Sequence, residues 1–96
     1  MQAPGFAGDA AMMPIHELRG LLEQGFPGGT IEIENPQGDG EHYQALIVSE
    51  RFQGMTLVEQ HQLVYRTLGD AMRGAVHALA LKTYTPAQWA HASARR

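Results

Sequence analysis

The chain has 96 residues, carries no cysteine and has a formal net charge of −3 at pH 7. This length predicts one domain, and 44% apolar with 18% charged residues is typical of a folded globular protein. The lack of cysteine excludes a disulfide scaffold, a thiol nucleophile and a cysteine-ligated zinc or iron–sulfur site made by this chain alone. No apolar run approaches the ~20 residues of a membrane span, and no signal peptide is evident, so we expect a cytoplasmic protein without a membrane partner.

The charge is unevenly distributed along the chain. Residues 1–50 carry one basic and eight acidic side chains, whereas residues 51–96 carry six basic and two acidic ones. Such asymmetry either marks an interaction face or disappears when the two halves pack together. Six basic residues spread over the second half do not form the stripe that is typical of nucleic-acid-binding proteins, which favours the second interpretation.

The first predicted element is a helix that follows an irregular segment. Residues 1–13 show no hydrophobic period, so we expect a flexible leader, then a single domain over residues 14–92 and a tail over 93–96. Pro14 suits a first helical position, and apolar residues recur after it at spacings of three and four. The glycines and proline near Gly25 predict the end of this helix.

Two strands are predicted next, joined by a turn. Residues 30–34 alternate strictly, which predicts a strand with Ile31 and Ile33 facing a core. Residues 35–40 have the composition of a turn. Residues 42–49 are apolar on both faces after Gln44, which favours a central strand paired with the first in an antiparallel hairpin.

A helix is predicted to begin at a capping box formed by Thr56 and Glu59. Gly69 is expected to break or kink it, and a second short helical piece is possible up to Arg73. The apolar residues of the main helix predict that its buried side comprises Leu57, Val58, His61, Val64, Tyr65 and Leu68.

The last elements are a third strand and a terminal helix. Residues 76–84 predict the strand, and the Thr85–Gln88 segment repeats the capping pattern before a helix that Trp89 is expected to anchor on the core. A helical connection between the second and third strands is a crossover, so these two strands should run parallel. The sequence therefore predicts an α+β domain with a mixed three-stranded sheet and helices on one face.

Five histidines occur in this short chain, and three of them have ordinary structural interpretations. His16 and His91 are expected on the surface of their helices. His61 lies on the predicted apolar side of its helix, which favours a buried and hydrogen-bonded core histidine over a ligand.

His42 and His77 differ because each opens a predicted strand. Parallel strands begin at the same edge of a sheet, so both imidazoles could bind one metal or cluster there. The alternative is that they are two hydrated residues at strand ends. Two imidazoles cannot complete a structural zinc site or hold a [2Fe–2S] cluster alone, and carboxylates such as Asp39 and Glu41 are hard ligands. Any cluster would therefore need thiolates from a partner.

Four short segments between residues 51 and 89, taken in their order along the chain, closely resemble the BolA-like family. The similarity covers about residues 14–90. The turn and the start of the second strand, residues 38–43, resemble the bacterial branch called IbaG-like. The four segments are Arg-Phe-Gln-Gly at residues 51–54, His-Gln-Leu-Val-Tyr at 61–65, Val-His-Ala-Leu-Ala-Leu at 76–81 and Thr-Pro-Ala-Gln-Trp at 85–89.

The resemblance implies a fold like the class II KH arrangement, with the order αββααβ. It also implies a monothiol glutaredoxin as partner, with a shared [2Fe–2S] cluster and glutathione, and roles in cluster trafficking, iron homeostasis, stress or transcription. His77 matches the histidine ligand of the family. The second family ligand is a Cys or His between the first two strands, and here that segment holds neither before His42, so His42 is carried over less directly. His61 matches a family histidine to which we assign a structural role.

The main alternative is a nucleic-acid-binding transcriptional regulator. Arg66, Arg73 and Lys82, with the two arginines of the tail, could contact phosphates. The Gly54–Leu57 segment is not the Gly-x-x-Gly loop of KH domains, which weakens the case for RNA binding. Neither serine lies in a Gly-x-Ser-x-Gly motif, so we do not expect an enzyme, and a homodimer is possible.

Overall fold

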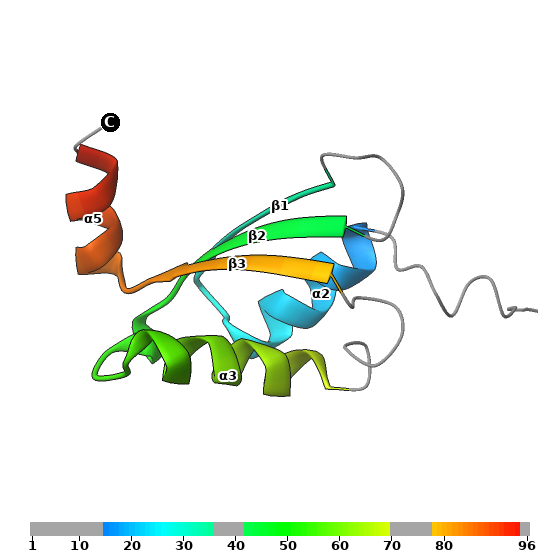
Figure 1. Cartoon of the computed structure of the whole chain (residues 1–96), viewed down its shortest axis with the longest axis horizontal. Coiled ribbons are helices and arrows are strands. Elements are labelled where there is room, and N and C mark those ends of the chain that lie inside the picture. The colour runs from blue at the N-terminus through cyan, green and yellow to red at the C-terminus, as the bar shows by residue number, and fades with distance from the viewer. Residues whose placement is uncertain (1–14, 36–41, 70–77, 95–96) are drawn as a thin grey trace, which may run out of the picture.

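The computed structural model describes residues 15–35, 42–69 and 78–94 (Figure 1). The predicted leader, the possible helical piece up to Arg73 and the first two residues of the predicted third strand lie outside these ranges. The elements in chain order are α2 (Ile15–Gly25), β1 (Thr30–Glu34), β2 (His42–Val48), the 3-10 helix η2 (Glu50–Phe52), α3 (Leu57–Leu68), β3 (Ala78–Tyr84) and α5 (Pro86–Ala94).

The sheet has the predicted mixed topology, with β2 in the centre of the order β1-β2-β3. β1 pairs with β2 in the antiparallel sense, and β3 pairs with β2 in the parallel sense. β1 is an outer strand, and Arg19 of α2 donates a hydrogen bond of 2.8 Å from Nη1 to the main-chain oxygen of Ile31. The hairpin and the crossover expected from the sequence are both confirmed.

α2 and α3 lie together on one face of the sheet (Figure 1), and the hydrophobic core fills the space between these layers. Ile31 and Ile33 are buried while their neighbours in β1 are exposed, as alternation predicts. Phe52 of η2 is fully buried, and its ring centroid lies 5.1 Å from that of Phe26. The other core residues are Leu18, Leu22, Tyr43, Ala45, Ile47, Leu63, Val64 and Leu68.

Both predicted capping motifs are present. Glu59 accepts a hydrogen bond of 2.8 Å from the main-chain N–H of Thr56, and the Thr56 hydroxyl accepts one of 3.2 Å from Glu59 N–H. At the start of α5, Thr85 and Gln88 exchange the same pair of hydrogen bonds, at 2.9 and 3.1 Å. These side chains satisfy main-chain donors that a helix start leaves free, so local sequence alone places both helix starts.

The predicted buried side of α3 is wrong in part. Leu57, Val58 and Tyr65 are 60%, 65% and 39% exposed, whereas the polar Gln60 is buried. Gln60 accepts a hydrogen bond of 2.7 Å from the Thr83 hydroxyl and donates one of 3.2 Å to a loop carbonyl. A satisfied polar group can lie in a core, and hydropathy therefore misplaced the buried stripe.

Two further side-chain predictions are corrected. His61 is half-buried at the border of the α3 core face, and its buried Nε2 has no hydrogen-bond partner within the described ranges. The buried face of α3 is centred on Gln60, Leu63 and Val64, which leaves His61 at its border. Trp89 does anchor α5, but against Tyr84 at a ring separation of 5.2 Å, on the sheet face opposite the helices.

Candidate functional site

The candidate site lies at the edge of the sheet where β2 and β3 begin. His42 is the first residue of β2, and its register partner is Ala78, the first residue of β3. Ala78 directly follows His77 in the chain. The structure thus confirms that the strands following these two histidines start side by side. The imidazole of His42 and the whole of His77 lie outside the described part of the molecule.

Core side chains fix the backbone next to this edge. Tyr43 is only 2% exposed, and its register partner Leu79 is partly buried against the same core. A one-residue slip of either strand would turn the core side chain of that strand, Tyr43 or Leu79, away from the core, which strongly disfavours any other register. The alignment of His42 with Ala78 therefore follows from core packing one residue further along each strand.

The residues of this chain could supply only part of the ligand set of an iron–sulfur cluster. No group of three or more His, Asp or Glu side chains that could hold a metal occurs within the described ranges, and the whole sequence has no cysteine. Imidazole nitrogen can replace thiolate as an iron ligand in a [2Fe–2S] cluster. If such a cluster binds here, His77 and His42 are the candidate nitrogen ligands, and any thiolate ligand would have to come from another molecule because the chain has no cysteine.

Two other histidines are where the sequence placed them. His16, in the first turn of α2, and His91, in α5, are both exposed. They serve as controls for the two histidines of the candidate site.

The basic residues considered for nucleic-acid binding do not share one surface among the described residues. Arg66 is exposed in the last turn of α3, which packs on the covered face of the sheet. Lys82 is exposed on β3, between Leu81, which packs on the core, and the buried Thr83. Alternation therefore places Lys82 on the opposite face. Arg73 lies outside the described ranges.

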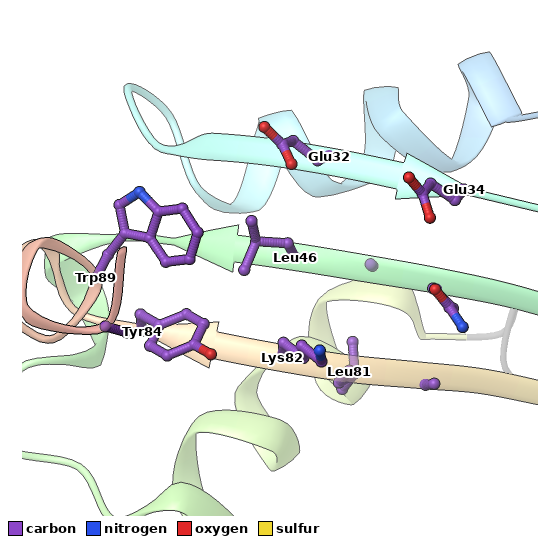
Figure 2. A pocket seen from close by; sticks show the side chains of 11 residues that line it. Glu32, Glu34, Leu46, Leu81, Lys82, Tyr84 and Trp89 are labelled. Carbon is purple, nitrogen blue, oxygen red and sulfur yellow. The ribbon is translucent and has the colours of Figure 1, made fainter. Parts of the chain in front are cut away.

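Sequence analysis missed a hollow of about 640 Å³ on the open face of the sheet (Figure 2). Glu32 and Glu34 of β1 lie along one side, Lys82 of β3 lies across from them, and Tyr84 with Trp89 closes one end. Alternation in β1 predicted that the glutamates face water. Which acidic and basic side chains become neighbours on this face depends on the register of the strands. That register could not be predicted from the sequence.

No helix in the described ranges is both long and apolar enough to cross a membrane.

Comparison with known proteins gives a consistent result. The model of the family described as BolA-like protein matches residues 27–88. The mouse protein named BolA-like protein 1 is 39% identical over 93 residues, which are 88% of this chain and 68% of the mouse protein. The structure of a BolA homologue from Coxiella burnetii superposes with a TM-score of 0.70 at 36% identity and covers 82% of this chain and 99% of that one.

Bacterial relatives include proteins with functional names. The DNA-binding transcriptional regulator BolA of Vibrio cholerae is 44% identical over 54 residues, or 56% of this chain and 51% of that protein. The acid stress protein IbaG of Escherichia coli is also 44% identical over 54 residues, or 55% of this chain and 64% of that protein. These names describe a regulator and a stress protein rather than enzymes.

Proposed function

The chain belongs to the BolA-like protein family, and from this premise we propose that it is a non-enzymatic partner of a monothiol glutaredoxin. The two proteins share a [2Fe–2S] cluster with the help of glutathione, in cluster trafficking or in the response to iron and stress. His77 supplies one nitrogen ligand and His42 a second. The partner and its glutathione supply the sulfur ligands that this cysteine-free chain lacks.

The observation that carries the proposal is the pairing of His42 with Ala78 in adjacent parallel strands. The backbone of His42 therefore lies beside Ala78, the residue that directly follows His77 in the chain. A single external ligand set could then reach both positions. The buried Tyr43 and the partly buried Leu79 hold the two strand starts in this alignment.

The test is to mix the chain with a monothiol glutaredoxin, iron, sulfide and glutathione without oxygen. We expect a heterodimer whose visible absorption and circular dichroism differ from those of the cluster-bound glutaredoxin homodimer. The His77→Ala variant should lose this difference, because a cluster ligand is removed. His91→Ala removes an exposed histidine of α5 and should behave like the wild type.

The outcomes separate the ligands from the function. If the mixture forms no cluster-bearing heterodimer, the function is wrong. If the heterodimer spectrum survives His77→Ala unchanged, the ligand assignment is wrong although the function stands. His42→Ala should shift the spectrum without abolishing the complex, because another donor can replace the second ligand.

A second candidate is a nucleic-acid-binding regulator, which the name of the Vibrio relative favours. Contacts with phosphates release counterions, so such binding should weaken steeply as salt rises. The Arg66→Ala and Lys82→Ala variants should both weaken it if these side chains contact the same nucleic acid. Their placement on opposite sides of the sheet makes this the less favoured function, and no binding to promoter DNA near physiological salt would exclude it.

A further inference from the structure

The open face of the sheet has charged side chains arranged in rows across the strands. Glu32 of β1 is the register partner of Leu46 in β2, and Leu46 is the register partner of Lys82 in β3. One row therefore runs from an acidic side chain through an aliphatic one to a basic one. Glu34 lies two residues further along β1, so it extends the acidic side of this face.

The side chains of this row are available to a partner. Glu32 and Lys82 are exposed, and Leu46 is half-buried. The hollow that they line holds about 640 Å³ and ends against the Tyr84–Trp89 pair (Figure 2). α2 and α3 cover the other face, and α5 projects from the end of β3 away from them (Figure 1), so no other element within the described ranges covers most of this side of the sheet.

We propose that this face binds a second copy of the chain around a two-fold axis parallel to β2. Rotation by half a turn about that axis lays β1 over β3 of the partner subunit and keeps positions along the strands unchanged. Glu32 then faces Lys82 of the partner subunit, and Lys82 faces Glu32 of the partner subunit. The two Leu46 side chains meet at the centre. Glu34 lies next to the ammonium group of Lys82 of the partner subunit.

Charge selects this arrangement over the alternative. A two-fold axis in the plane of the interface but across the strands would lay β1 antiparallel on β1 of the partner subunit, so that the glutamates of one copy would face those of the other. Like charges placed opposite each other disfavour association. With the axis parallel to β2, the acidic β1 edge of each copy lies on the basic β3 edge of the other. The face is then complementary to itself, as a two-fold interface requires.

The size of the face sets the strength of the contact. Three strands about 4.8 Å apart and up to seven residues long span roughly 14 by 23 Å, or about 300 Å² of sheet per copy. Stable complexes bury about 800 Å² per partner. The dimer is therefore expected to be weak and to form only at high concentration.

Sedimentation velocity of the isolated, iron-free chain over a concentration series up to about 1 mM provides the test. The wild type should pass reversibly from monomer to dimer. Glu32→Lys and Lys82→Glu should each weaken association by roughly tenfold or more. Each substitution places like charges opposite each other at both contacts between position 32 of one copy and position 82 of the other. An equimolar mixture of the two variants should associate again, because in a mixed dimer opposite charges face each other at both of these contacts.

Glu23→Lys makes the same charge change at an exposed position on α2, and it should leave the association unchanged. Thermal unfolding of each variant verifies that the monomer is intact. A wild type that stays monomeric at about 1 mM overturns the proposal, even if another protein proves to bind this face. So does a variant mixture that associates no better than its components. The cluster experiment above is independent of this result, since no iron or glutaredoxin is present.

Discussion

The two faces of the three-stranded sheet differ although the same strands form both. On the covered face, Ile31, Ala45 and Ile47 are buried beneath α2 and α3. On the open face, the residues between them include Glu32 and Leu46, with Lys82 on the neighbouring strand. One set of alternating positions therefore stabilises the fold, while the other is free to carry binding chemistry. Substitutions should separate these two roles.

The largest effect is expected where the covered face is packed most closely. Phe52→Ala removes a fully buried ring that packs on Phe26. It should lower the free energy of unfolding by about 3–5 kcal/mol, because the lost transfer energy and the cavity add. Urea unfolding measures this cost. Leu46→Ala on the open face is the matched variant and should cost under about 1 kcal/mol, and equal costs for the two would refute the comparison.

The buried polar link between α3 and β3 comes next. Gln60→Ala leaves the Thr83 hydroxyl without the acceptor that it has at 2.7 Å, and one loop carbonyl without its donor. We expect a loss of about 2–3 kcal/mol, because buried polar groups without partners pay their desolvation. A double-mutant cycle with Thr83→Val should show coupling. Strictly additive losses would mean that the hydrogen bond contributes nothing specific.

A smaller effect is expected where α2 approaches α3. A Cβ at Gly25 would collide with Cγ2 of Thr67. Gly25→Ala should therefore destabilise by about 1 kcal/mol, since overpacking of about 1–3 kcal/mol outweighs the gain of up to about 1 kcal/mol in helix propensity. In a Thr67→Ala background the same change should become neutral or stabilising. Thermal unfolding would detect the reversal, and a loss of equal size in both backgrounds would contradict this explanation.

The smallest effect on global stability is expected at α5, which has no buried residues. Trp89→Ala removes the ring that packs on Tyr84 and should release this helix while changing the free energy of unfolding of the core by less than about 1 kcal/mol. Hydrogen exchange should show lost protection confined to residues 86–94. A cooperative loss of several kcal/mol across the whole chain would show that α5 belongs to the main folding unit.

Local signals in the sequence were reliable for the fold. The Thr56–Glu59 box and the alternation around Ile31 concern neighbouring residues, so both could be predicted and both are confirmed. The buried side of α3 was misjudged because Gln60 is buried through its hydrogen bond to Thr83, 23 residues away in the chain. The partner of Trp89 was missed for a different reason, because hydropathy does not reveal which face of the sheet a terminal helix reaches.

The candidate site was predictable in outline. The helical connection between the second and third strands requires a crossover, so the parallel start of the two strands could be expected. The exact partners could not be expected, because the register of His42 with Ala78 depends on how Tyr43 and Leu79 enter the core. The acidic-to-basic row of the open face depends on the same register and was likewise invisible in the sequence.

The hydrogen bond from Arg19 to the main chain of Ile31 has a consequence for the behaviour of damaged molecules. It comes from the first described helix and occupies a carbonyl of an outer strand, where unguarded main-chain groups template the addition of foreign strands. Proteolytic removal of α2 would expose the free edge of β1 and the side chains of Ile31 and Ile33. Truncated molecules should then assemble without limit into fibrous aggregates, in contrast to any closed association of the intact chain.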